Sequence, residues 1–103
     1  NTLVPAGTLI EGVALKPAIF GIAVGRDGTI FFSDHQSARV FRRSPGGVLS
    51  IFAGNGQGGS TGDGSAATLA SMVFPRALAL DPAGALYIGQ AGNIRRVGPD
   101  GII

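Results

Sequence analysis

The sequence predicts an all-β chain built from two copies of a four-stranded antiparallel unit, and three observations predict it. Short apolar runs alternate with turns that contain glycine or proline, which is typical of short strands. Glycine makes up 18 of the 103 residues, well above the usual share of about 7%, and it shows no three-residue period. In addition, one stretch of the sequence recurs 56 residues later.

The repeat is clearest in the first two strands of each unit. Residues 22–32 align with residues 78–88, with apolar positions on apolar positions and a turn glycine on a turn glycine. Asp27-Gly28 predicts a type I′ hairpin turn, in which both central residues take positive φ. The second copy carries a four-residue version of this turn at 81–84. Each unit is therefore expected to begin with a hairpin.

A third and a fourth strand follow each hairpin. Residues 39–43 and 94–97 predict the third strand. A Pro-x-Gly turn comes next and occurs three times, at 5–7, 45–47 and 99–101. A strand is expected after each of the first two turns, at 8–14 and at 48–53, and the strand at 48–53 is the fourth of its unit. Only Ile102-Ile103 follow the third turn. Four short antiparallel strands joined by tight turns make one blade of a β-propeller.

The two units are joined by a long glycine-rich segment. Residues 54–64 hold most of its glycines, and residues 65–72 contain good helix formers that predict one or two helical turns. A phosphate-binding loop would end in Lys-Ser or Lys-Thr and would lie between a parallel strand and a helix. This segment has neither feature, so it is interpreted as a linker between blades.

Several of these segments together resemble NHL repeats. They are 20–24, 30–34, 45–47 and the run from Ala53-Gly-Asn-Gly through Gly62-Asp-Gly64 to Pro75, with 86–88, 92–93 and 99–101 in the second copy. The run resembles the inter-blade linker of bacterial, often extracytoplasmic, NHL proteins and of teneurin-like propellers. The resemblance implies two NHL-type blades within 1–103, at about 5–44 and 45–98, with strand 8–14 completing a neighbouring or terminal blade. It also favours an extracytoplasmic location.

Two blades cannot close a ring, and the resemblance implies six. The missing blades would come either from a longer parent chain or from further copies of this chain, and three copies would supply six blades. The expected partner is therefore the chain itself, with a trimer favoured, or the remaining blades of a longer protein. Both possibilities stay open at the level of the sequence.

Candidate ligand-binding residues fall in loops that are expected to share one face of the blades. They are Asp34, His35, Gln36, Arg39, Asp63, Gln90 and Asn93. His35 is the only histidine, and a zinc site normally needs three or four ligands. Asp34 stands where the family has an acidic residue after the second strand, and Gln90 replaces it in the second copy. No catalytic residue, metal ligand or cofactor is assigned.

A non-enzymatic scaffold for binding or structural interaction is the favoured function, with no ligand identified. The resemblance leaves two alternatives, part of a metal-dependent NHL-type lyase or an RNA-binding NHL propeller. Seven arginines and one lysine, against six acidic residues, give a net charge of +2. The basic residues do not form a dense patch, so nucleic-acid binding is not expected. Cysteine is absent, and no apolar run is long enough for a membrane helix or shows the pattern of a signal peptide.

Overall fold

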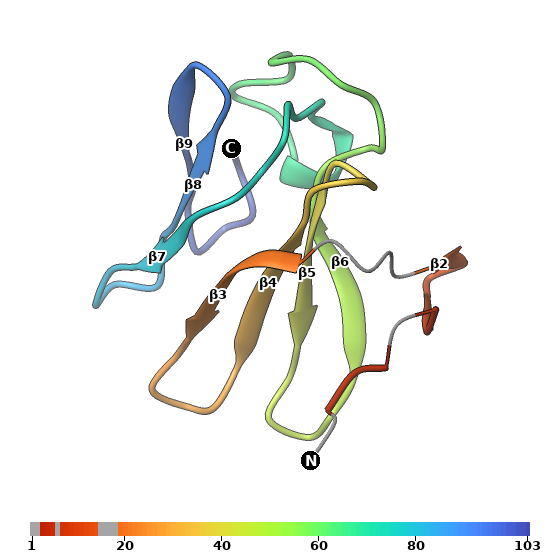
Figure 1. Ribbon diagram of the computed structural model, residues 1–103. Helices are drawn as coiled ribbons and strands as arrows, with labels where there is room; N and C mark the ends of the chain where they lie inside the picture. The colour runs from red at the N-terminus through yellow and green to blue at the C-terminus, as the bar shows by residue number, and fades with distance from the viewer. Residues whose placement is uncertain (1–2, 6, 15–18) are drawn as a thin grey trace.

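A computed structural model describes residues 3–5, 7–14 and 19–103 and has the expected all-β architecture (Figure 1). Three antiparallel sheets follow one another along the chain. The first is a small hairpin of β1 (Leu9–Ile10) and β2 (Val13–Ala14). The second, called the first blade, is β3 (Ile19–Val24), β4 (Ile30–Asp34), β5 (Arg39–Arg43) and β6 (Leu49–Ala53). The third, called the second blade, is β7 (Leu78–Leu80), β8 (Leu86–Gln90) and β9 (Asn93–Val97).

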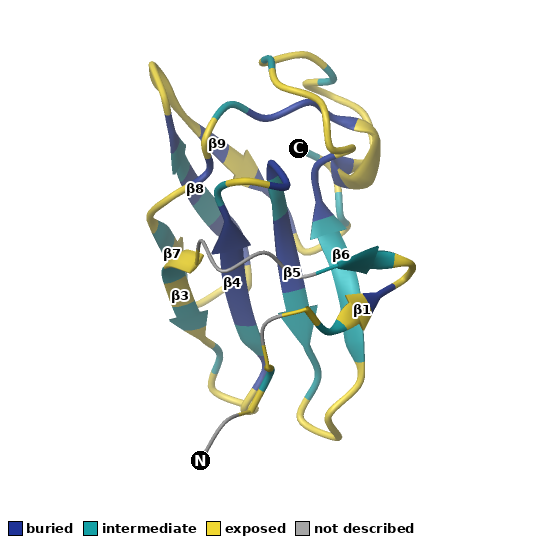
Figure 2. Ribbon diagram, turned by 45° about the vertical axis from the view of Figure 1, so that its right-hand side comes forward, coloured by how far each residue is buried: buried dark blue, intermediate teal, exposed yellow. Residues whose placement is uncertain are grey.

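The first blade is a four-stranded meander in the order β3-β4-β5-β6, as the repeat predicts. β6, which follows the second Pro-x-Gly turn, pairs with β5 in this sheet. The boundary between blades expected at 44–45 therefore falls inside the first blade, between β5 and β6. Figure 2 shows β4 and β5 as its most buried strands. The edge strand β3 instead has exposed apolar side chains on alternate residues, including Ile22 and Val24.

The hairpin turns of the two blades have the same geometry, which differs from the type I′ turn expected at Asp27-Gly28. Gly28 has φ of 95°, but Asp27 is not among the residues with positive φ. The Gly28 N–H donates to the Gly25 carbonyl, and the Gly25 N–H donates to the Thr29 carbonyl. This is a type I turn followed by a left-handed glycine, the three-residue hairpin loop. The Asp27 carboxylate accepts the Thr29 N–H at 2.9 Å, which stabilises Asp27 in the turn with negative φ.

The amino-terminal segment differs from the single strand expected at 8–14. It folds into the β1–β2 hairpin because Glu11 and Gly12 both take positive φ, at 50° and 83°. Two positive-φ residues between paired strands are the requirement of a type I′ turn. Ile10 is 1% exposed and packs on Phe32 and Phe41, so the hairpin lies over the first blade near β5 and β6 (Figure 2).

The second blade has three strands in the described part of the chain. After the third Pro-x-Gly turn, Ile102 makes a single antiparallel bridge to Ala66, and the Gly98 N–H donates to the Ile102 carbonyl. Only one turn of 3-10 helix, η1 (Ala67–Leu69), forms in the linker segment where one or two helical turns are expected. None of the helices in the described residues is long and apolar enough to span a membrane.

The main hydrophobic core lies between the two blades. It contains eight buried residues, drawn from β4, β5 and β6 of the first blade, the linker and the second blade: Phe31, Val40, Ala53, Ala67, Met72, Leu86, Ile88 and Val97. β3 and β7, the first strand of each blade, lie next to each other. The blades therefore pack face to face, as neighbouring blades of a propeller do.

Candidate functional site

The loops predicted to share one face of the blades do lie at one end of the molecule, the upper end in Figure 1. They are the β4–β5 loop, the linker 54–77 and the β8–β9 turn. The Arg39 guanidinium donates to the Asn55 carbonyl at 3.2 Å, and the Ala91 N–H donates to the Val73 carbonyl at 3.0 Å. The loop ends of both blades and the linker are thus tied into one surface, called here the loop face.

An exposed cluster of rings and a cation lies on the loop face where the two blades meet. The His35 ring stacks on Phe74, with centroids 4.6 Å apart and planes 27° from parallel. The Phe20 ring also contacts His35, with centroids 5.2 Å apart and planes 60° from parallel. The Arg76 guanidinium lies 5.1 Å from the centroid of Phe20, in cation–π geometry. These four residues, called the aromatic cluster, come from β3, the β4–β5 loop and the linker.

Two phenylalanines of the aromatic cluster are open to solvent although both are large and apolar. Phe20 is 60% exposed and Phe74 is 49% exposed. Phe74 also has φ of 47°, a left-handed conformation that is costly for a bulky residue. The next residue, Pro75, is fully buried. Exposed rings on a strained segment are typical of a binding surface.

The backbone beneath the aromatic cluster is held by one hydroxyl group. Ser33 Oγ donates to the Arg76 carbonyl at 2.7 Å and accepts the Gly21 N–H at 2.9 Å. A Cβ at Gly21 would lie 1.8 Å from the Arg76 carbonyl oxygen, so only glycine allows β3 to approach the chain so closely. Ser33 and Gly21 therefore fix the junction between β3, β4 and the start of the second blade.

The candidate residues of the first blade lie around His35. Asp34 is fully buried, and its carboxylate accepts the Gln36 N–H at 3.1 Å and the Ser37 N–H at 3.5 Å, which shapes the β4–β5 loop. Arg39 spans from this loop to the linker through its bond to the Asn55 carbonyl. Gln36 is exposed. Asp34 and Arg39 thus position the loop that presents His35 and Gln36.

The candidate residues of the second blade form a separate group that holds the glycine-rich linker. Ser60 Oγ accepts hydrogen bonds from Gln90 Nε2 and Asn93 Nδ2, both at 3.0 Å. Asp63 Oδ1 accepts from Arg95 Nη2 at 2.7 Å and from Arg95 Nε at 3.1 Å. These side chains fold the linker over the end of β8 and β9.

Arg95 is the centre of this second group. It is 5% exposed and also donates to the carbonyls of Ser71 and Thr61, so its guanidinium bridges both arms of the linker. A Cβ at Gly59 would come within 2.8 Å of Ser71 Oγ, and one at Gly62 within 2.8 Å of the Ala70 Cα. The glycines therefore allow close backbone packing, in agreement with the linker interpretation.

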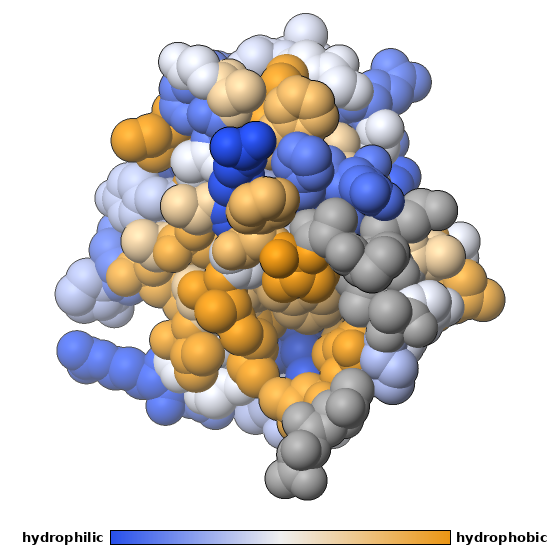
Figure 3. All heavy atoms as spheres, viewed as in Figure 1, coloured by the Kyte–Doolittle hydropathy of each residue, from blue (hydrophilic) through white to orange (hydrophobic). Residues whose placement is uncertain are grey.

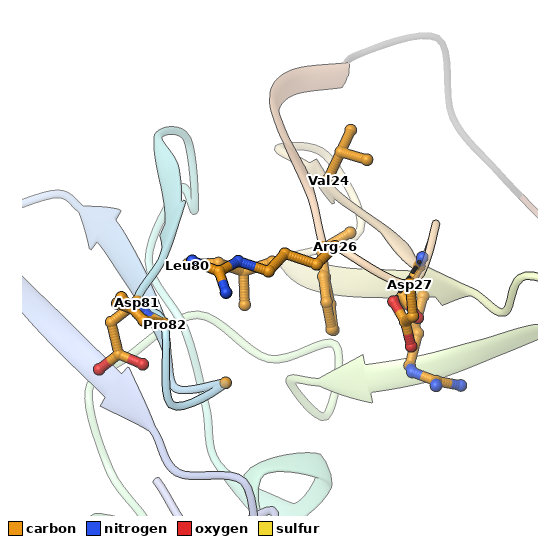
Figure 4. Close-up of a pocket in the computed structure, with 11 residues that line it drawn as sticks. Val24, Arg26, Asp27, Leu80, Asp81 and Pro82 are labelled. Atoms are coloured by element: carbon orange, nitrogen blue, oxygen red, sulfur yellow. Dashed lines mark hydrogen bonds between the residues drawn. The ribbon is translucent and has the colours of Figure 1, made fainter.

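A cleft of about 560 Å³ opens at the opposite end of the blades, between their hairpin turns. Figure 4 shows the Arg26 side chain reaching from the first blade toward Leu80 on the second. The backbone N–H of Thr29 holds the pKa of Asp27 below its ordinary value of 3.8. A hydrogen bond from the Ala85 N–H likewise lowers the pKa of Asp81. Both carboxylates thus stabilise the turns that border the cleft.

The described residues contain no group of three or more His, Cys, Asp or Glu side chains arranged to hold a metal ion. His35 was predicted as a site residue from the sequence, whereas the three residues around it were not. A signal for two of them was present, because Phe20 and Arg76 occupy the same position of the 56-residue repeat. Equivalent residues of adjacent blades lie side by side, so their contact follows from the repeat.

No family model matches the chain. The solved structure of selenomethionine-substituted virginiamycin B lyase from Staphylococcus aureus matches it with a TM-score of 0.59 and 17% sequence identity, over 82% of this chain and 25% of that one. This chain therefore spans about a quarter of the length of that protein, which is a β-propeller. At this identity the likeness concerns the fold, and the chain has the fold of a partial β-propeller.

Proposed function

We propose that this chain is part of an NHL-type β-propeller that serves as a non-enzymatic binding scaffold, with the aromatic cluster as its recognition surface. The observation that carries the proposal is the pair of exposed phenylalanines, Phe20 and Phe74, that flank His35 beside an exposed arginine. Ligands of propellers bind at loop ends near the central channel. β3 and β7, the first strands of the two blades, border this cluster.

The repeat motifs support the NHL assignment. The second strand ends in Phe-Ser-Asp at 32–34, a Pro-Gly-Gly turn follows at 45–47, and Gly-Asp-Gly occurs in the linker at 62–64. Each has a structural role in the first blade or the linker. Asp34 shapes the β4–β5 loop, the Gly47 N–H closes its turn on the Ser44 carbonyl, and Asp63 binds Arg95.

The chemistry of the aromatic cluster selects a ligand that carries an apolar or aromatic group next to an anionic group. The exposed faces of Phe20 and Phe74 offer apolar contact area and ring stacking. The Arg76 guanidinium presents fixed donors that match a carboxylate or a phosphate. His35 contacts both rings and adds a polar edge. A phenyl phosphate group contains both features in one small molecule.

Titration with phenyl phosphate at constant pH tests this proposal, followed by the NMR signal of His35, the only histidine of the chain. We expect a saturable shift of that signal in the wild-type chain and in Arg26→Gln, an exposed arginine at the opposite end. The shift should be lost in Arg76→Gln, because that substitution removes the cation and leaves the rings. A shift that stays linear in ligand, or one of equal size in Arg76→Gln, would refute the assignment.

A further inference from the structure

The β3 side of the first blade presents an apolar face that the described residues leave largely exposed. Ile22 and Val24 are each 63% exposed, and Ile19 is 45% exposed. Figure 3 shows hydrophobic side chains gathered over this strand on the face in view. Contiguous exposed apolar surface of this kind marks an interaction site. The internal repeat indicates which partner fits this face.

The repeat relates this face to one that is already buried inside the molecule. Ile22, Ile30 and Phe32 correspond, by the shift of 56 residues, to Leu78, Leu86 and Ile88. In the second blade, Leu86 and Ile88 are fully buried in the core between the blades, and Leu78 packs against the same core. The open face of the first blade is therefore the same surface that the second blade turns toward its neighbour.

The complementary surface is open on the second blade. Phe31 and Val40 of the first blade contribute to the core between the blades. Their equivalents in the second blade are Tyr87 and Ile94. Ile94 is 75% exposed and Tyr87 is partly exposed. Each chain thus carries a partly open receiving face and an open donating face of the same blade–blade interface.

The amino-terminal hairpin already fills part of the receiving face. Aligned on the Pro-x-Gly turns, residues 8–14 correspond to 48–54, which contain the fourth strand of the first blade. Ile10 is buried on Phe32 and Phe41, so the position of a preceding blade's fourth strand is occupied. What is missing beside the hairpin is the first three strands of such a blade.

The second blade supplies these three strands. In the described part of the chain it contains β7, β8 and β9, and none of the described strands pairs with the outer edge of β9. An apolar hollow of about 180 Å³ remains on the receiving face, between Val4 of the amino-terminal segment and Ile22 of β3. The candidate occupants from the second blade are Ile94 and the ring of Tyr87, whose hydroxyl donates to Asp81 Oδ2 at 3.1 Å.

We propose that the second blade of another copy of this chain packs on the receiving face, with Tyr87 and Ile94 directed into the hollow and β9 beside the amino-terminal hairpin. This contact continues the blade–blade interface that exists within the chain. Because it is head-to-tail, its repetition closes a ring when the rotation between successive copies divides a full turn, as the rotation between the blades of a propeller does. Two to four copies give the four to eight blades of known propellers, and three copies give six. The contact does not involve the loop face and does not depend on a ligand there.

Two variants with opposite defects test the proposal by light scattering. Ile22→Glu spoils the receiving face, and Ile94→Glu spoils the donating face; both positions are exposed, so the fold should remain. We expect the wild-type chain to assemble to two to four times its 10.3 kDa mass, with three the favoured number. Each variant alone should be a monomer, and an equimolar mixture should form a one-to-one dimer. Val48→Glu, at an exposed turn between β5 and β6, is the matched control and should assemble like the wild type.

The mixture separates this mode from nonspecific association, because only a head-to-tail contact restores a single interface per pair. A wild-type chain that stays monomeric up to its solubility limit would overturn the proposal, since the face would then belong to another partner. A mixture that remains monomeric would overturn it as well. If either glutamate variant lacks the wild-type circular dichroism, Ile22→Ser and Ile94→Ser replace them with the same expected outcomes.

Discussion

Replacing Arg95 by alanine should destabilise the chain far more than neutralising its acidic partner. The Arg95 side chain is 4% exposed, whereas the Asp63 side chain is 76% exposed. An ion pair with one partner in water contributes at most about 1 kcal/mol. The carbonyls of Ser71 and Thr61, by contrast, accept charged hydrogen bonds from Arg95, and Ser71 is buried.

The magnitude follows from these contacts. Removing a charged donor from a buried carbonyl costs about 1.5 to 3 kcal/mol, and loss of the buried arginine stem adds to it. We therefore expect Arg95→Ala to lower the free energy of unfolding by about 3 kcal/mol. Asp63→Asn should lower it by no more than about 1 kcal/mol. Arg96→Ala, the exposed neighbour on β9, should stay within about 0.5 kcal/mol of the wild type.

Urea unfolding followed by circular dichroism measures these differences, and hydrogen exchange shows where they arise. The amides of Ser71 and Met72 donate to carbonyls of the linker, so their exchange should accelerate in Arg95→Ala while that of the β4–β5 pair does not. An equal loss of stability in Asp63→Asn and Arg95→Ala would refute this expectation, because the salt bridge would then be the main interaction. An Arg95→Ala variant no less stable than Arg96→Ala would refute it as well.

Three further substitutions probe other parts of the fold. Gly21→Ala should lower the free energy of unfolding by about 3 kcal/mol or more, because its Cβ would lie 1.8 Å from a carbonyl oxygen. Gly58→Ala is the control: a Cβ there would have no atom within 4 Å, so its stability in thermal unfolding should be nearly that of the wild type. Met72→Ala should lower the free energy of unfolding, measured in urea, by about 2 to 5 kcal/mol, because this side chain is fully buried between the blades. A smaller loss would mean that the core collapses into the space left by the side chain. Asp81 has a lowered pKa in the folded chain, so its stabilising effect is present above its ordinary value of 3.8 and is lost as the pH falls through the folded value. Asp81→Asn should therefore lose less stability than the wild type when the pH is lowered from about 5 to about 2; equal losses in acid titrations would contradict this.

The strands of both blades could be predicted because their apolar alternation repeats with the same shift. The turn at Asp27 could not be assigned in detail, because the choice between two hairpin loops depends on a side-chain bond to Thr29 that composition does not reveal. The hairpin at 8–14 was missed for a related reason, since Glu11 gives no local signal for positive φ.

The candidate site was predicted in part. The loop face and His35 follow from the order of strands and loops in a blade. The stacking of His35 with Phe74 depends on how a long linker returns to the first blade, which is a tertiary property. The pairing of Asp63 with Arg95 spans 32 residues and joins a loop to a strand, so neither residue alone indicates it.

The junction at Gly21 and Ser33 is one of the contacts that hold the two blades at a fixed angle to each other. One hydroxyl joins β3 and β4 of the first blade to the backbone that leads into the second, where β3 comes close to the carbonyl of Arg76. In a circular array, the number of blades is the full turn divided by the angle between neighbours. A side chain at Gly21 would push β3 away from the Arg76 carbonyl, change the angle between the blades and so change the number of blades that closes a ring. In a closed ring, the number of blades would therefore depend on a contact only a few atoms wide.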